Sequence, residues 1–203
     1  MTHLIVHNTH IYIRELPSDI DSLLPQCSAT IIEQVNSISS PRRKREIVAC
    51  HLLIKKIFGE GVSISHDENG APLLCGAEGF ISISHSATEI AVAYNPLHII
   101  GVDIENWRDQ LIKVKSRFLS PQEMDIYSTA QLTLKAWTLK EAIYKVAQSP
   151  GISLAEDIML PLAIDETIAK ANTHNGVRDF QTFEITSTPS RCVTLAFPLL
   201  KTT

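Results

Sequence analysis

The segment that most constrains the fold is the apolar, β-branched run of residues 98–105, which contains two carboxylates. Such a run favours a β-strand, in which residues two apart point to the same face. Asp103 and Glu105 are therefore predicted to lie on one face, roughly 7 Å apart. At that separation two like charges repel by about 2 kcal/mol at an effective dielectric constant of about 20. A bound cation would remove this repulsion, so the sequence predicts a metal site on this strand.

A predicted helix over residues 130–148 carries a third carboxylate. Its apolar residues recur at helical spacing and form a stripe for the core: Leu132, Ala136, Leu139, Ile143 and Val146. A second stripe combines aromatic, ammonium and carboxylate groups: Trp137, Lys140, Glu141, Tyr144 and Lys145. Taken alone, Glu141 and Lys145 are typical of an exposed i,i+4 pair worth about 0.3 to 0.5 kcal/mol. Together with Asp103 and Glu105, however, Glu141 completes a set of oxygen ligands that suits Mg²⁺ and disfavours zinc or copper.

Short apolar segments and turn residues alternate along the rest of the chain. We expect helices near residues 20–24, 31–35, 41–58, 110–118, 121–128 and 130–148. We expect strands near residues 4–6, 11–13, 62–65, 80–84, 90–94, 98–105, 157–160, 180–185 and 192–197. The predicted fold class is α+β, with an N-terminal half over residues 1–97 and a C-terminal half over residues 98–203. The second half carries the predicted metal site.

Composition argues against several classes of protein. With 44% hydrophobic and 20% charged residues, the chain is typical of a folded globular protein. Its net charge of −4 disfavours a nucleic-acid binder. The sequence contains neither an apolar run long enough for a membrane span nor the pattern of a signal peptide. We therefore expect a protein of the cytoplasm, with neither nucleic acid nor membrane as a partner.

Two segments of the first half have the chemistry of a phosphate site. The predicted helix over residues 41–58 begins with the basic run Arg42 to Arg45, and a helix N-terminus with added basic residues favours phosphate. Such a run is also typical of a solvated helix face. Ser84 and His85 lie at the end of a predicted strand, where a hydroxyl or an imidazole can contact phosphate. A Ser-His-Asp hydrolase is not indicated, because the sequence has no GxSxG motif and adjacent strand residues point apart.

These motifs, in this order, resemble the 4′-phosphopantetheinyl transferases. The similarity is to the larger, surfactin-type group, whose single chain is a pseudo-dimer of two α+β halves. It implies a monomer with its active site in the cleft between the halves. It covers about residues 40–160, and the GVDIE and WxxKEAxxK segments at this separation carry most of it. The matching segments are NGAP at 69–72, ISHS at 83–86, GVDIE at 101–105, RFLSPQE at 117–123, WTLKEAIYK at 137–145 and, more weakly, GISL at 151–154.

The resemblance implies transfer of the 4′-phosphopantetheine arm of coenzyme A to a serine of an apo acyl or peptidyl carrier protein, which releases adenosine 3′,5′-bisphosphate. It implies that Asp103, Glu105 and Glu141 hold Mg²⁺ against the coenzyme A pyrophosphate. Glu141 is also the implied general base for the carrier serine, directly or through a water, and Lys145 would stabilise or protonate the leaving phosphate. The implied coenzyme A contacts are Ala71, Ser84, His85, Lys145 and one basic residue of the run Arg42 to Arg45, for which Arg45 is the best candidate.

Two positions depart from the family's pattern. Ala71 stands where many members have lysine, and His51 stands where related bacterial members have another basic residue. Losing one exposed phosphate contact is expected to weaken coenzyme A binding by about 1 kcal/mol, without abolishing the chemistry.

Three other functions remain as alternatives. A catalytically weak or inactive homologue would act as a coenzyme A or carrier-protein binding module. A Mg²⁺-dependent phosphohydrolase would use the same three carboxylates and release phosphate without any carrier protein. Nucleic-acid binding through Arg42 to Arg45 would show a steep salt dependence, but the acidic balance and the lack of interleaved aromatic residues disfavour it.

Overall fold

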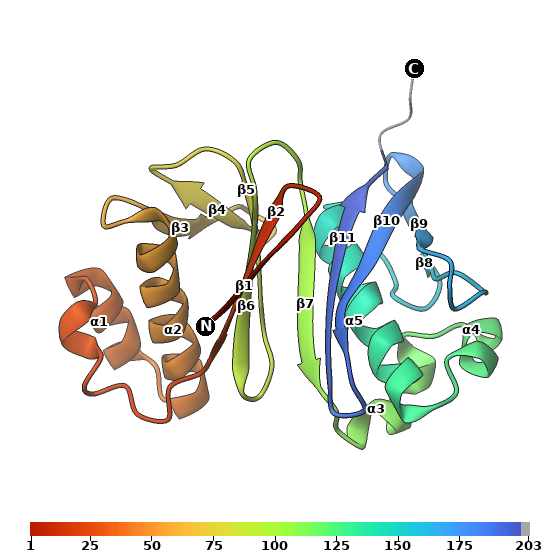
Figure 1. Cartoon of the computed structure of the whole chain (residues 1–203), viewed down its shortest axis with the longest axis horizontal. Helices are drawn as coiled ribbons and strands as arrows, with labels where there is room; N and C mark the ends of the chain where they lie inside the picture. Colours follow the sequence, from red (N-terminus) through yellow and green to blue (C-terminus); the bar gives the residue numbers. More distant parts are fainter. Residues whose placement is uncertain (200–203) are drawn as a thin grey trace.

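The computed structural model describes residues 1–199 as two antiparallel sheets that stand side by side, each with a long helix on its outer face (Figure 1). The first half contains β1 (Thr2–Val6), β2 (Thr9–Glu15), η1 (Leu24–Gln26), α1 (Ala29–Ser37), α2 (Pro41–Phe58), β3 (Ser63–His66), β4 (Pro72–Cys75), β5 (Phe80–His85) and β6 (Glu89–Asn95). The second half contains β7 (Gly101–Asn106), α3 (Gln110–Lys113), η2 (Lys115–Arg117), α4 (Pro121–Ile126), α5 (Ala130–Ala147), β8 (Ile158–Met159), β9 (Ile168–Thr173), β10 (Gly176–Ser187) and β11 (Arg191–Pro198).

The strands of the two halves form separate sheets. The first sheet runs β1-β2-β6-β5 and the second runs β7-β11-β10-β9-β8, while β3 and β4 form a small sheet of their own. The paired strands are antiparallel. The expected α+β class, with helices and a sheet in each half, is therefore confirmed.

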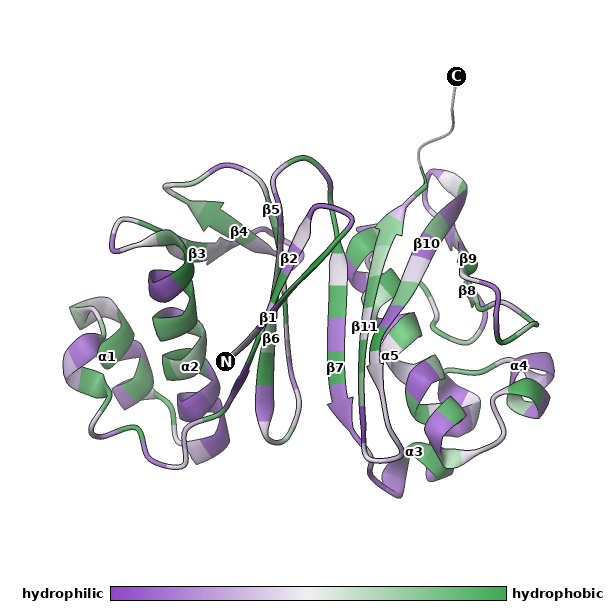
Figure 2. Ribbon diagram, in the orientation of Figure 1, coloured by the Kyte–Doolittle hydropathy of each residue, from purple (hydrophilic) through white to green (hydrophobic). Residues whose placement is uncertain are grey.

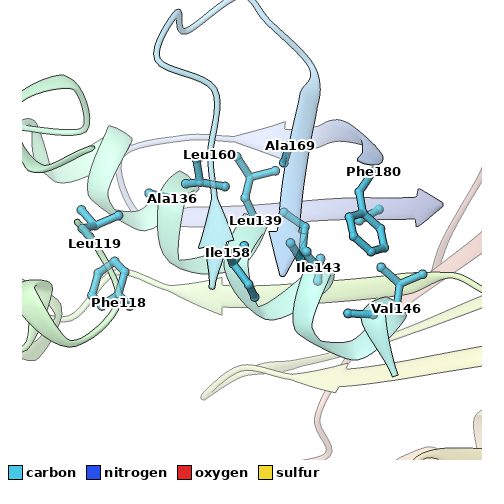
Figure 3. Packing of buried hydrophobic residues seen from close by; sticks show 14 of the residues in the cluster. Phe118, Leu119, Ala136, Leu139, Ile143, Val146, Ile158, Leu160, Ala169 and Phe180 are labelled. Atoms are coloured by element: carbon cyan, nitrogen blue, oxygen red, sulfur yellow. The ribbon is translucent and has the colours of Figure 1, made fainter. Parts of the chain in front are cut away.

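The layers are helix, sheet, sheet and helix, and each boundary buries apolar side chains. Between the sheets, Ile11 and Ala93 meet Val102 and Leu195. Apolar residues of α2 cover the outer face of the first sheet. On the outer face of the second sheet, Leu139 and other residues of α5 pack against side chains from β8, β9 and β10 (Figure 3). Consequently β7 lies between the first sheet and α5 (Figure 1).

Helix α2 begins and ends at the residues that its sequence predicts. The Ser40 side chain accepts a hydrogen bond from the backbone N–H of Arg43, and Pro41 takes the first helical position, where it needs no N–H partner. Gly59 ends the helix with a φ of 93°, which is strained for residues with a side chain. Among residues 1–199, no helix combines the length and the apolar character that a membrane span needs.

Several expected elements differ from the structure. The helix expected near residues 20–24 was wrong: the segment forms turns and the short 3₁₀ helix η1, where Pro25 supplies no N–H donor. The helix expected over 110–118 is divided into α3 and η2. Strands β4 and β9 were not expected, because both are short edge or hairpin segments with few large β-branched residues.

Gly101 allows α5 to lie directly on β7. A Cβ atom at this position would come within 2.0 Å of the carbonyl oxygen of Ala142 and 3.1 Å of the backbone nitrogen of Val146. Helix and strand can therefore approach closely only where residue 101 has no side chain. This contact fixes the distance between α5 and the carboxylates of β7.

We expect Gly101→Ala to lower the free energy of unfolding by about 1 to 3 kcal/mol, because the added methyl group must push α5 away from β7. Urea denaturation measures the loss. Gly61→Ala is the matched control, since no heavy atom lies within 4 Å of a Cβ built there. Equal stability of the two variants would contradict the close approach.

Candidate functional site

Strand β7 presents two carboxylates to α5. Val102 and Ile104 point into the core between the sheets, so Asp103 and Glu105 occupy the opposite face. Figure 2 shows this as alternating hydrophobic and hydrophilic bands along β7. Asp103 is 5% exposed and Glu105 is half-buried. Burial of two neighbouring carboxylates needs compensating partners.

Asp103 receives two hydrogen bonds on one oxygen. The Ser84 hydroxyl on β5 donates to Asp103 Oδ1 at 2.6 Å, and the Lys145 ammonium on α5 donates to the same atom at 2.8 Å. Lys145 also donates to the carbonyl oxygen of Val102 at 2.9 Å. Residues from β5, β7 and α5 therefore meet at Asp103.

Glu105 has partners near the end of β7. The Arg108 guanidinium donates to Glu105 Oε2 at 3.1 Å, and the backbone N–H of Asn106 donates to Oε1 at 3.0 Å. Burial nevertheless raises the pKa of Glu105, and the nearby charge of Arg108 only partly opposes that shift. Sequence reasoning had not identified Arg108 as a partner of this carboxylate.

Glu141 has the most perturbed carboxyl of the site. Burial, followed by the negative charge of Asp103, raises the pKa of Glu141 to about 7, while Lys145 opposes the shift. Within residues 1–199, Glu141 forms no side-chain hydrogen bond or ion pair in this arrangement. A carboxyl that titrates near neutrality beside charged partners is typical of a proton-transfer or cation-binding site.

The donor types fit a hard divalent cation. Three carboxylates on facing elements are the oxygen ligands that Mg²⁺ prefers. A cation would relieve the repulsion from Asp103, which adds to the effect of burial in raising the pKa of Glu141. Thr194 on β11 lies opposite Asp103 in the strand register, and its buried hydroxyl has no hydrogen-bond partner among residues 1–199. The ligand shell is not assembled, because no three acidic, histidine or cysteine side chains of residues 1–199 converge as a metal site. In the structure, Lys145 and Arg108 pair with Asp103 and Glu105 instead.

A cavity of about 560 Å³ opens beside Lys145 and lies between the halves. Its walls include Ala71, Phe80, Ile99 and Tyr144, which come from both halves. The backbone N–H of Ala71 donates to Asp67 Oδ1 at 2.8 Å and so holds the turn that forms one wall. This wall is mostly apolar, with the ammonium of Lys145 at one side.

A second cavity, of about 590 Å³, lies beside α2 and is lined in part by basic side chains. It shares Gly70, Pro72 and Ile83 with the first, so the two cavities adjoin each other. Arg43 and His85 are among its lining residues. Together the two cavities form a path from the N-terminal turns of α2 to Lys145 on α5, whereas Asp103, Glu105 and Glu141 are not among their lining residues.

Glu46 holds two arginines of α2 in place beside the second cavity. It is 7% exposed and accepts hydrogen bonds from Arg42 Nε at 2.9 Å and Arg43 Nη1 at 3.1 Å. Burial raises its pKa, but the hydrogen bonds from the two arginines outweigh burial and leave the pKa below its ordinary value. Burial lowers the pKa of His85, and Glu46, at 4.0 Å from His85 Nδ1, opposes this. Sequence reasoning missed the role of Glu46, although its i,i+3 and i,i+4 spacing from the arginines is a recognisable signal.

Arg45 and His51 differ in their position relative to the second cavity: His51 is one of its lining residues and Arg45 is not. Arg45 is half-buried, its Nε is buried without a hydrogen-bond partner, and it is absent from the residues lining the second cavity, whereas Arg43 is present. His51 Nε2 accepts a hydrogen bond from the backbone N–H of Ser28 at 3.4 Å, and burial lowers its pKa. His51 is therefore neutral near pH 7 and connects the start of α1 to α2.

Helical spacing predicted that Lys140 lies in the polar stripe of α5, and this prediction was wrong. Its side chain is fully buried, and its ammonium donates to Glu123 Oε2 at 2.7 Å and to the carbonyl oxygens of Leu154 and Ile158 at 2.8 and 2.6 Å. Lys140 points away from Asp103 and binds α5 to α4, to the segment before β8 and to β8 itself. Its function in the fold is structural.

The pKa of Glu141 predicts a pH-dependent effect of Mg²⁺ on stability. Because the folded-state pKa of about 7 exceeds the ordinary carboxyl value, the native state binds more protons and its stability falls as pH rises through about 7. The facing groups Asp103 and Glu105 add repulsion as Glu141 ionises, and Lys145 and Arg108 partly offset it. We expect Mg²⁺ to raise the melting temperature more at about pH 8 than at about pH 6, since only the ionised carboxylate binds the ion. A Mg²⁺ effect that is independent of pH, or unchanged in Glu141→Gln, would contradict this prediction.

Residues 99–201, just over half of the chain, match the family model of the 4′-phosphopantetheinyl transferase superfamily. The matched region includes Asp103, Glu105, Glu141 and Lys145, whereas Ser84 and His85 precede it. No curated protein matches the sequence.

Proposed function

Because the chain belongs to the 4′-phosphopantetheinyl transferase superfamily, we propose that it transfers the 4′-phosphopantetheine arm of coenzyme A to a serine of an apo acyl or peptidyl carrier protein. The serine oxygen attacks the phosphorus that bears pantetheine, and the bond from this phosphorus to the bridging oxygen of the pyrophosphate breaks. The serine loses its proton, and adenosine 3′,5′-bisphosphate leaves.

The observation that carries this proposal is the half-buried Glu141, whose pKa of about 7 suits a general base at neutral pH. It accepts the proton of the carrier serine, directly or through a water. Asp103, Glu105 and Glu141 are the residues that would hold Mg²⁺, which supplies charge neutralisation at the pyrophosphate. Lys145 lines the first cavity and has an ammonium that can turn from Asp103 to the leaving phosphate.

Coenzyme A is proposed to lie along the two adjoining cavities between the halves. The arginines around Glu46 supply positive charge for its phosphate at the nucleotide end, and the imidazole of His85 can donate a hydrogen bond to it. Ala71 lines the first cavity and offers no charge there. Arg43 lines the second cavity and is better placed than Arg45 to contact the phosphate, because Arg45 lines neither cavity. A contact from Arg45 to coenzyme A stays a prediction.

The surfactin-type subgroup is part of the proposal. Each half contains an antiparallel sheet and a long outer helix, α2 or α5, and this supports a pseudo-dimer of residues 1–97 and 98–203. We propose a monomer that acts in the cytoplasm, with carrier proteins and coenzyme A as its partners.

A product assay distinguishes transfer from hydrolysis. The protein is incubated with coenzyme A and Mg²⁺, with and without an apo carrier protein, and adenosine 3′,5′-bisphosphate is followed by chromatography. We expect release only when the carrier is present. Equal release without carrier would indicate a phosphohydrolase, and no release in either case together with coenzyme A binding would indicate a binding module.

A further inference from the structure

The Asp103 carboxylate is held from the neighbouring half of the molecule. Ser84 belongs to β5 in the first sheet, and its hydroxyl donates to Asp103 Oδ1 at 2.6 Å. Ser84 is 6% exposed and Asp103 is 5% exposed. A short hydrogen bond to a carboxylate in a buried place strongly restricts the rotation of that carboxylate.

The two known partners of Asp103 use the same oxygen. Lys145 donates to Oδ1 as well, at 2.8 Å, so Oδ1 has two donors. Among residues 1–199, no hydrogen bond or ion pair involves Oδ2. A carboxylate bound in this way offers one oxygen to a cation, which is the single-oxygen contact that the octahedral shell of Mg²⁺ accommodates.

Ser84 and Lys145 differ in how permanently they can hold Asp103. The Lys145 side chain is 27% exposed and borders the first cavity, where it can turn toward an arriving phosphate. Ser84 is buried between the halves and donates to the carboxylate of Asp103 at short range. Once Lys145 turns away, the Ser84 hydroxyl is the contact that keeps Asp103 in orientation.

We propose that Ser84 is a positioning residue for the metal site, and that its hydroxyl fixes Asp103 so that Oδ2 faces the cation. This differs from the coenzyme A contact that the resemblance implies for Ser84, because the hydroxyl is turned to β7. The inference rests on the proposed function, in which Asp103 binds Mg²⁺. Second-layer partners of this kind typically change metal affinity by about 10- to 100-fold when they are removed.

The chain contains a matched control two residues away. Ser82 lies on the same face of β5, and its hydroxyl accepts a hydrogen bond from the backbone N–H of Val102 at 3.0 Å. Ser82→Ala therefore removes one hydrogen bond between the same two strands without touching a carboxylate. Ser84→Thr keeps a hydroxyl at the positioning site.

The experiment measures Mn²⁺ binding to the full chain by electron paramagnetic resonance, with Mn²⁺ alone as the probe. We expect Asp103→Asn to abolish binding, Ser84→Ala to raise the Kd about 10-fold, and Ser82→Ala and Ser84→Thr to bind within about twofold of the unsubstituted protein. Melting temperatures of Ser84→Ala and Ser82→Ala should fall by similar amounts, which separates a positioning effect from loss of stability.

Two other results would overturn the inference in different ways. If Asp103→Asn abolishes Mn²⁺ binding while Ser84→Ala binds like Ser82→Ala, the positioning role fails and the proposed function stands. If Mn²⁺ binding does not occur, or does not depend on Asp103, the proposed metal role fails, and the role of Ser84 fails with it.

Discussion

Glu141→Gln is expected to lower kcat/KM for carrier modification by about 10²- to 10⁴-fold, the range lost when a general base is removed. The amide keeps the shape of the side chain but can neither accept the serine proton nor bind a cation as strongly. The substitution also removes a charge that is disfavoured by burial and by repulsion from Asp103 and Glu105, the causes that raise the pKa of Glu141. The melting temperature should therefore equal or exceed that of the unsubstituted protein in the absence of Mg²⁺.

Steady-state kinetics with an apo carrier protein, together with thermal denaturation, test this prediction. Glu156→Gln makes the same charge change at an exposed position near β8 and serves as the control. Activity of Glu141→Gln within about threefold of the unsubstituted protein would argue against any role of this carboxylate as a base, since a base contributes at least about 10²-fold.

Glu123→Ala is expected to lower the free energy of unfolding by about 3 to 5 kcal/mol, because it leaves the ammonium of Lys140 buried without its counterion. Glu123 also accepts hydrogen bonds from the backbone N–H groups of Ser120 and Leu160, both at 2.8 Å. The loss is a large part of the usual stability of a folded domain. We expect the variant to be mostly unfolded at temperatures where the unsubstituted protein is folded.

The loss of stability in Glu123→Ala should depend on pH. Burial already lowers the pKa of Lys140, and the nearby Glu123 opposes this shift. Without Glu123 the folded-state pKa should fall further below its ordinary value, so the unfolded state binds more protons and stability rises with pH. Urea denaturation of Glu123→Ala at about pH 7 and about pH 9 should show a smaller deficit at the higher pH. The double variant Glu123→Gln with Lys140→Met should recover part of the loss, and no recovery would contradict a cost that arises from an unpaired ammonium.

Local patterns predicted the elements that carry the site. The cap at Ser40 and the stop at Gly59 define α2, and the alternation from Val102 to Glu105 defines the faces of β7. These signals are local, because capping and two-residue periodicity depend only on neighbours in sequence. The same reasoning identified Asp103, Glu105, Glu141 and Lys145. In the structure Lys145 pairs with Asp103, and the charges of Asp103, Lys145 and Glu105 act on the pKa of Glu141.

Contacts between distant segments could not be predicted in this way. Helical spacing places Lys140 beside Glu141, but its burial depends on Glu123 in α4 and on carbonyl groups of Leu154 and Ile158. The bond from Ser84 to Asp103 likewise requires that β5 lie beside β7 across the boundary between the halves. Such partners are fixed by tertiary packing rather than by the spacing of residues along one element.

The most direct test of the proposed function is intact-protein mass spectrometry of an apo carrier protein after incubation with this protein, coenzyme A and Mg²⁺. The predicted result is a carrier that gains the mass of one phosphopantetheine group, and no gain when Asp103→Ala or Glu141→Ala replaces the unsubstituted protein. Absence of the gain with several types of carrier protein, despite measurable binding of coenzyme A, would contradict the transferase assignment.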